Sequence, residues 1–194
     1  MSRDKILAAV KTSQPELQPL PTLNDVPAIQ FPDAVAQFKA TLQVIGGFIA
    51  TAKQISEVEG IIKQLFPQAV KIVSAVPDIA SLSAEHWQQQ DPHALEDVTV
   101  GVISSSLAVA ENGAIWVTEK DMQQVRVLPF IVEHLVAVVH AKDMVSNMQQ
   151  AYQRIDSAPG FNVFIAGPSK TADIEQSLVL GAHGPKSMTV VVVE

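Results

Sequence analysis

Runs of apolar and β-branched residues alternate along this chain with segments whose apolar side chains recur at helical spacing. Seven runs are typical of strands: residues 48–50, 69–74, 98–103, 114–118, 135–140, 161–166 and 188–193. Three further segments place apolar residues at i, i+3, i+7 and i+10, starting from Val35, Ile55 and Val145, which is the pattern of amphipathic helices. Because the strand runs are continuously apolar, both faces of the sheet should be covered. The pattern therefore predicts a three-layer α/β/α fold with a mixed, largely parallel sheet.

A proline-rich arm precedes this α/β pattern. Ser2 can cap a short helix, and five prolines follow between Pro15 and Pro32. Because proline at that density prevents regular structure, we expect residues 1–31 to form a helix and an extended arm, and residues 32–194 to form one α/β domain. The arm carries apolar residues that should pack on the main body or on a neighbouring subunit of a homo-oligomer: Leu20, Leu23, Val26, Ile29 and Phe31.

Composition excludes several classes of partner and cofactor. The net charge is -7 and the 13 Lys and Arg residues are scattered, which disfavours nucleic acid as a partner. Without cysteine, the chain has no thiol nucleophile and no cysteine-bound zinc or iron–sulfur cluster. Neither a glycine-rich dinucleotide motif nor a P-loop occurs, and the 5 histidines lack metal spacing, so no cofactor or metal is evident. No apolar run reaches the roughly 18 residues of a membrane helix, and we expect a cytoplasmic protein with no membrane partner.

Two polar motifs lie between the last two strand runs. Residues 167–175 read GPSKTADIE, and residues 181–185 read GAHGP. Polar loops that follow buried strands lie at the edge of a sheet, where α/β proteins usually bind their ligands. These motifs are therefore the first place to look for a ligand site.

The first motif carries the groups of an anion site. The backbone amides that follow Gly167 can converge with the hydroxyls of Ser169 and Thr171 on one small anion. The ammonium of Lys170 can add a positive charge to the same site. A phosphate or a carboxylate would suit this set of donors. The alternative is that one of the two hydroxyls caps a helical turn starting near Ala172, which needs no ligand.

Three titratable side chains complete the two motifs. Asp173 and Glu175 share a face only if the segment is extended, because residues two apart diverge on a helix. A paired carboxyl group would have a raised pKa suited to acid–base work; the alternative is a solvated Asp and a helix-terminal Glu. His183 precedes Gly184, and glycine lets a ligand approach closely, so the imidazole can transfer a proton or orient a ligand. The alternative is a loop histidine bonded to a nearby carbonyl.

The two motifs resemble those of the lactate-utilisation protein C family, also called the LUD-domain family, in which a strand leads into G-P-S-x-T-A-D-I-E and then G-x-H-G-P. The resemblance extends from about Phe31 to the C-terminus, through residues 110–113 (AENG) and 126–129 (RVLP). At residues 112–114 the family more often carries Thr-Gly-Thr or Thr-Gly-Ser than the Asn-Gly-Ala of this chain. The family is related in fold to the NagB/RpiA/CoA-transferase-like group, so the resemblance implies that architecture here.

The same resemblance implies a function. Family members act with iron–sulfur partner subunits and oxidise L-lactate to pyruvate, so this chain would be an accessory, ligand-sensing or substrate-handling member of such a complex. The ligand that the motifs imply is a small anionic metabolite.

Residues 110–113 also look like the S-E-N-G turn of CoA-transferases, whose glutamate attacks an acyl-CoA thioester. That resemblance makes Glu111 a candidate nucleophile, with Asn112 and Gly113 supplying a tight turn of positive φ. The alternatives are an ordinary hairpin signal, and a structural or ligand-positioning role for the glutamate. Arg126 can bind a substrate carboxylate or form an ordinary surface ion pair.

Three classes of function therefore stay open: an accessory protein that binds an anion, an acyl- or CoA-transfer enzyme that uses Glu111, and a structural subunit without a ligand. The first two require the loop after Ala166, the imidazole of His183 and the turn near Glu111 to surround one cavity. Trp116 and Tyr152 are too isolated for a stacking platform, and we expect both in the core.

Overall fold

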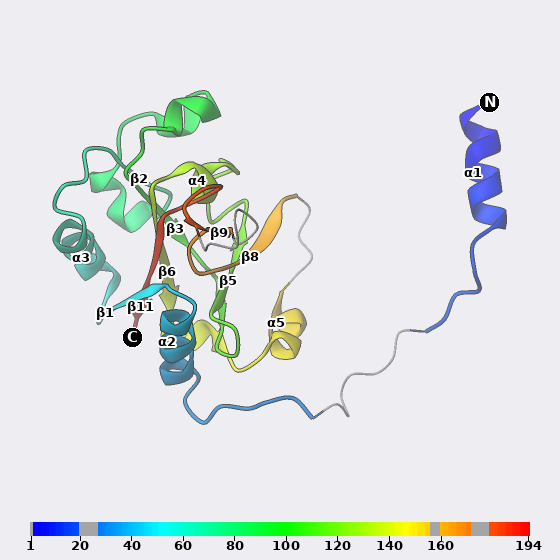
Figure 1. Cartoon of the computed structure of the whole chain (residues 1–194), viewed down its shortest axis with the longest axis horizontal. Coiled ribbons are helices and arrows are strands. Elements are labelled where there is room, and N and C mark those ends of the chain that lie inside the picture. The colour runs from blue at the N-terminus through cyan, green and yellow to red at the C-terminus, as the bar shows by residue number, and fades with distance from the viewer. Residues whose placement is uncertain (1, 20–26, 156–159, 172–178) are drawn as a thin grey trace.

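The computed structural model describes residues 2–19, 27–155, 160–171 and 179–194 (Figure 1). Its α-helices are α1 (Arg3–Thr12), α2 (Ala34–Val44), α3 (Val58–Leu65), α4 (Leu128–Ile131) and α5 (Met148–Arg154). Its strands are β1 (Phe48–Ala52), β2 (Ile72–Ser74), β3 (Val100–Ser104), β4 (Leu107–Val109), β5 (Ala114–Thr118), β6 (His134–His140), β7 (Met144–Val145), β8 (Asn162–Ala166), β9 (Lys170–Thr171), β10 (Val179–Leu180) and β11 (Ser187–Val193). Short 3₁₀ turns are η2 (Ile55–Glu57), η3 (Pro77–Leu82), η4 (Trp87–Gln89), η5 (Pro92–Leu95) and η6 (Ala141–Asp143).

Five strands form the central sheet in the order β1-β11-β6-β3-β2, and every pairing in it is parallel. The middle pair is the longest, with Ser187 opposite His134 and Val193 opposite His140. Each of the seven predicted strand runs contains a strand, and the largely parallel central sheet is confirmed.

The central sheet is covered on both faces, which explains its continuously apolar strands. Along β6, Val136 and Val138 face a cluster that includes Val58 and Ile62 of α3. The intervening residues of β6, such as Ala137, face a second cluster with α2 and the other sheet. Since neighbouring side chains of a strand point to opposite faces, a strand buried on both sides must be apolar at every position.

A second sheet covers one of these faces, in the order β7-β4-β5-β8. Strand β5 pairs antiparallel with both β4 and β8, so the predicted runs 114–118 and 161–166 belong to this sheet and not to the central one. Its outer face packs against α5 through a small cluster that includes Leu107 and Ala151. Figure 1 shows the resulting order across the molecule: α3, the central sheet, the second sheet and α5.

The three predicted helices form, with two differences in detail. Asp33 caps α2, accepting a hydrogen bond from the Ala36 amide at 2.9 Å. Helix α5 is shorter than its apolar pattern, because Val145 belongs to β7 and Asn147 caps the helix. Helix α3 is preceded by the 3₁₀ turn η2, and three further 3₁₀ turns, η3 to η5, lie between β2 and β3.

The aromatic expectations were partly wrong. Tyr152 is 65% exposed, although the edge of its ring approaches Phe164 of β8, with ring centroids 6.0 Å apart. Trp87 occupies the core instead and is 2% exposed, although its polar surroundings in the sequence do not signal burial. Trp116 is half-buried and packs on Phe164 of the neighbouring strand, with ring centroids 4.5 Å apart.

The arm contacts the body only at its end, among the described residues. The Phe31 amide donates to Ser146 Oγ at 3.0 Å, and Asn147 Nδ2 donates to the Ile29 carbonyl at 2.7 Å, which attaches the arm to the start of α5. Leu17 is 97% exposed. The predicted contacts of Leu20, Leu23 and Val26 lie outside the described residues.

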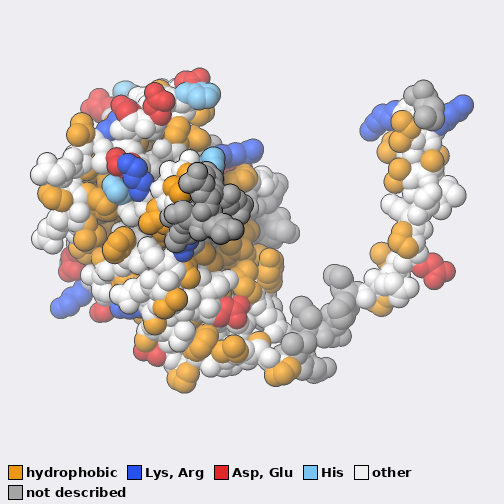
Figure 2. All heavy atoms as spheres, viewed as in Figure 1, with side chains coloured by type: hydrophobic (Ala, Val, Ile, Leu, Met, Phe, Trp, Pro, Cys, Tyr) orange, Lys and Arg blue, Asp and Glu red, His pale blue; other side chains and the backbone are white. Residues whose placement is uncertain are grey.

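Helix α1 buries none of its residues, and its apolar side chains lie at the surface in Figure 2. No helix in the described part of the chain combines the length and the apolar character that crossing a membrane requires.

Candidate functional site

The two polar motifs near the C-terminus form one local structure. Strand β8 ends at Ala166 and leads into the first motif, and β9 then pairs antiparallel with β10, with Thr171 opposite Val179. The amide of Ser169 donates to the Pro185 carbonyl at 3.0 Å, and the amide of Gly181 donates to the Ser169 carbonyl at 3.1 Å. Two stretches separated in sequence are therefore held together by backbone hydrogen bonds.

Gly184 favours this close approach. A Cβ atom at position 184 would lie 3.1 Å from Cβ of Ser169, which is tighter than nine in ten such contacts. The second motif thus passes directly over the first, and a side chain at this point would push them apart.

Both motifs line a cavity of about 330 Å³, which we call the tail cavity. Of the predicted site residues, Gly167, Ser169, Lys170, His183 and Gly184 line it. The remaining wall comes from β8, the Pro185 turn, and three apolar residues: Pro129, Phe130 and Leu135. His183 is exposed and Ser169 is half-buried, so solvent reaches the polar end. The tail cavity combines hydrogen-bond donors with an apolar wall, which suits a small molecule with one charged end.

Lys170 has a structural contact that its sequence position does not reveal. Its Nζ donates to the carbonyl of Ile45, the residue that ends α2. A cation at this position interacts favourably with the negative end of the helix dipole. An ammonium has three donors, so this bond leaves two for a ligand.

The other residues predicted for the first motif are only partly described. Thr171 lies on β9 and is not among the residues that line the tail cavity. Asp173, Glu175 and the helical turn expected near Ala172 lie outside the described residues. Their roles stay predictions.

The structure places Glu111 at the start of α5. Its Oε1 accepts a hydrogen bond from the Met148 amide at 2.6 Å, and its own amide donates to the Ser146 carbonyl at 3.0 Å. The carboxylate therefore satisfies one of the amides that a helix leaves free at its first turn. It does not line the tail cavity, so only two of the three expected pieces share that space.

Asn112 and Gly113 form the tight turn that the sequence predicts. Asn112 Oδ1 accepts from the Ala114 amide at 3.0 Å, and Gly113 has a φ of 69°. A Cβ at Gly113 would be 3.1 Å from Cδ1 of Ile45, and one at Gly167 would be 3.0 Å from the Ile45 carbonyl oxygen. Both glycines thus permit close packing against the end of α2, and the two loops meet there.

Arg126 forms an ion pair with Glu119 through Nε, and its side chain is 62% exposed. This is the surface pair that the sequence left open as the alternative to carboxylate binding. Arg126 lines neither the tail cavity nor the larger cavity described next.

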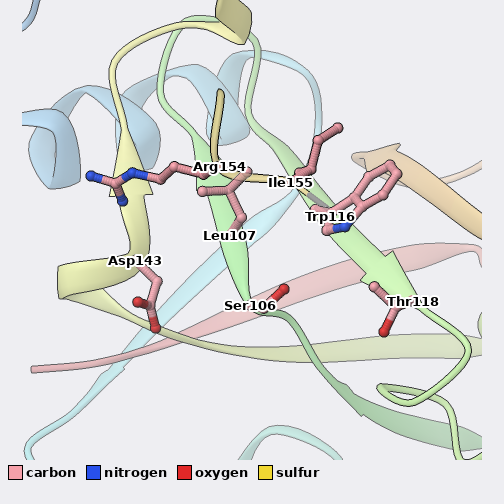
Figure 3. A pocket seen from close by; sticks show the side chains of 7 residues that line it. All are labelled: Ser106, Leu107, Trp116, Thr118, Asp143, Arg154 and Ile155. Atoms are coloured by element: carbon pink, nitrogen blue, oxygen red, sulfur yellow. The ribbon is translucent and has the colours of Figure 1, made fainter. Parts of the chain in front are cut away.

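A second cavity, of about 480 Å³, escaped the sequence reasoning (Figure 3). It is lined by Ser106, Leu107, Trp116, Thr118, Asp143, Arg154 and Ile155. It lies beyond the carboxyl ends of the adjacent strands β3 and β6, where the two sheets meet. The sequence contained a signal for this cavity, because Ser105 and Ser106 directly follow the largely buried strand β3.

The resolved pKa shifts lie at surface ion pairs outside both cavities. A hydrogen bond from Lys186 holds the pKa of Glu133 below its ordinary value, and one from Lys63 does the same for Glu59. These shifts reflect pairing at the surface, and they identify no acid–base group in either cavity.

Comparisons with known proteins identify the family of this chain. A family model described as the LUD domain matches residues 78–193. The chain is 33% identical over 112 residues to the lactate utilization protein C of Geobacillus thermodenitrificans, a match covering 54% of this chain and 46% of that protein. A protein of the same name from Anoxybacillus flavithermus is 35% identical over 102 residues, covering 52% of this chain and 46% of that protein. The chain spans about half the length of these curated relatives.

A solved structure shows the same fold. The crystal structure of a DUF162 family protein from Deinococcus radiodurans aligns with a TM-score of 0.66 and 15% sequence identity, covering 83% of this chain and 96% of that one. At this identity the likeness supports the fold alone.

Proposed function

Because this chain belongs to the LUD domain family, we propose that it acts in lactate utilisation as an accessory protein that binds a small anionic metabolite in the tail cavity. The name of its curated relatives supports the pathway. One observation supports the binding site most directly: residues of both polar motifs line a single cavity, and they supply a hydroxyl, an ammonium and an imidazole.

The tail cavity suits an anion with a small apolar part. Lys170 supplies a positive charge at the rim, and His183 adds a second when it is protonated. Ser169 can donate from its hydroxyl, while Phe130 and Leu135 provide an apolar wall for carbon atoms. A carboxylate such as that of lactate or pyruvate meets these requirements.

The partners in this proposal are iron–sulfur subunits. Oxidation of lactate to pyruvate removes two electrons, and this chain has no cysteine with which to hold a cluster. The resemblance to the LUD-domain family implies that partner subunits accept the electrons, while this chain handles or senses the carboxylate. We place the complex in the cytoplasm.

Titration calorimetry tests the ligand. We expect heat with L-lactate or pyruvate, and about tenfold weaker binding for Lys170→Gln, because a charge-assisted hydrogen bond is lost. Ser169→Ala keeps the contact of Lys170 with α2 and should also weaken binding. Lys63→Gln, on the other side of the central sheet, is the matched control and should bind as the wild type does.

Two outcomes would refute the proposal. The first is the absence of heat with lactate, pyruvate and a sugar phosphate for a folded protein. The second is binding that neither substitution in the tail cavity affects.

A further inference from the structure

The larger cavity, which we call the junction cavity, has two chemically different ends (Figure 3). Trp116 forms one end, with its indole held against Phe164. Leu107 is 3% exposed and Ile155 is half-buried, so both add fixed apolar surface beside the indole. This end can cover an apolar group of a ligand, because a buried aromatic face gains most from displaced water.

The opposite end is charged. Arg154, the last residue of α5, extends away from the indole in Figure 3, and Asp143 of η6 lies on the same side. Neither side chain forms an ion pair with another described residue. A guanidinium and a carboxylate at one cavity, without a described partner for either, offer both signs of charge to a ligand.

Two hydroxyl groups also line the cavity: Ser106 lies between these ends in Figure 3, and Thr118 lies on the side of Trp116. Ser106 follows β3 and is exposed, so its hydroxyl is free to rotate toward a bound molecule. Thr118 is fixed, because its Oγ1 donates to Asp121 Oδ2 at 2.6 Å. With its only proton engaged, Thr118 presents acceptor lone pairs to the cavity.

We propose that the junction cavity binds a small carboxylic acid that carries a hydroxyl or ammonium group next to the carboxylate and a bulky apolar group beyond it. Arg154 pairs with the carboxylate through its planar fork. Asp143 accepts a hydrogen bond from the neighbouring donor group. Trp116 covers the apolar group.

The position and size of the cavity agree with this assignment. Ligands of α/β proteins bind beyond the carboxyl ends of parallel strands, and β3 and β6 end here. A volume of about 480 Å³ lies within the range of about 300–1,000 Å³ typical of small-molecule sites. No residue lines both cavities, so this proposal stands or falls separately from the lactate site.

Four related probes test each required group. L-phenylalanine and L-phenyllactate carry the carboxylate, the donor and an aromatic ring; 3-phenylpropanoate lacks the donor, and phenethylamine lacks the carboxylate. Binding is followed by calorimetry and by the fluorescence of Trp116. We expect at least one of the first two to bind about tenfold or more tightly than either truncated probe.

Substitutions assign the contacts. Arg154→Gln should weaken binding about tenfold or more, while Arg3→Gln makes the same chemical change on α1 and should have no effect. Asp143→Asn should weaken an ammonium ligand more than a hydroxyl ligand, because the amide oxygen still accepts a hydrogen bond but carries no charge. Trp116→Phe should abolish the fluorescence change while keeping most of the affinity for the aromatic probes.

The proposal is overturned if neither phenylalanine nor phenyllactate binds the folded protein. It is also overturned if their affinities match those of the truncated probes, or if Arg154→Gln and Asp143→Asn leave them unchanged. Unfolding curves of each variant establish that it is folded, which is expected because Arg154 is exposed and Asp143 is half-buried.

Discussion

The inner strands of the central sheet and the edge strand β8 of the second sheet are built from similar residues but are buried to different degrees. Strands β6 and β11 have five and six buried residues in a row, whereas no residue of β8 is fully buried. Strands β6 and β11 lie between two apolar clusters, whereas β8 borders the tail cavity. We infer that stability depends mainly on the inner strands of the central sheet, and that the tail-cavity site depends on the looser packing around β8.

The largest expected difference in the free energy of unfolding is between a substitution in an inner strand of the central sheet and the same substitution in β8. Ile103→Ala, at a fully buried position of β3, should lower the free energy of unfolding by about 2–5 kcal/mol, because it leaves a cavity in the core. Ile165→Ala in half-buried β8 is the same change and should cost about 1–2 kcal/mol, since water already reaches part of this side chain. Urea unfolding measures both free energies. Equal losses in the two variants would show that the two strands do not differ in their contribution to stability.

A pair of glycine substitutions should have opposite signs. Gly184→Ala should cost about 1–2 kcal/mol, because its Cβ would press on Ser169, and it should weaken binding in the tail cavity. Gly60→Ala lies at an exposed position of α3, where a Cβ meets nothing within 4 Å, and should stabilise the protein by about 0.5–1 kcal/mol. Thermal unfolding measures both effects. Destabilisation by Gly60→Ala would contradict the expectation that a methyl group at this position stabilises the helix without a clash.

Substitutions of Glu111 test whether its hydrogen bond to the Met148 amide stabilises the packing of α5 on the second sheet. Glu111→Ala should cost about 1 kcal/mol, because the Met148 amide loses its acceptor. Glu111→Gln keeps an acceptor oxygen and should cost less than half of that. Chemical denaturation of the two variants gives the difference; a Gln variant as unstable as the Ala variant would mean that the charge, and not the hydrogen bond, matters.

The smallest effect concerns the surface pair of Glu133 and Lys186, at the amino ends of β6 and β11. The pKa of Glu133 is lowered in the folded state, so its contribution is present above the unfolded pKa and is lost as pH falls through the folded pKa. Because the Glu133 side chain is 43% exposed, we expect less than about 1 kcal/mol. Lys186→Gln should lower the melting temperature slightly at neutral pH and not at a pH where the carboxyl is protonated. A difference that persists in acid would rule out this pair as its cause.

The sequence predicted the elements better than their arrangement. Apolar periodicity correctly located all seven strand runs and three of the helices, because burial of a local face requires that local pattern. It did not separate β5 and β8 from the central sheet, since strands of both sheets contribute apolar residues to the same cluster. It also missed β4 and β7, which are too short to leave a periodic signal.

For the candidate site as well, the sequence predicted the local motifs but not the contacts between distant segments. The two polar motifs predicted a ligand site that includes residues 167–170 and 183–185, and the structure brings these loops together around one cavity. The sequence did not predict the contact of Lys170 with Ile45 or that of Glu111 with Met148, each of which joins distant parts of the chain.

The sequence by itself determined where the longer strands and the amphipathic helices lie and which loops carry polar groups, because these properties depend on residues close together in the chain. Only the tertiary structure decided which strands share a sheet, which polar side chains serve helix ends, and that Asp143, Arg154 and Trp116 border a single cavity. These relations depend on packing between segments, and the contacts that stabilise them leave no repeating pattern in the sequence.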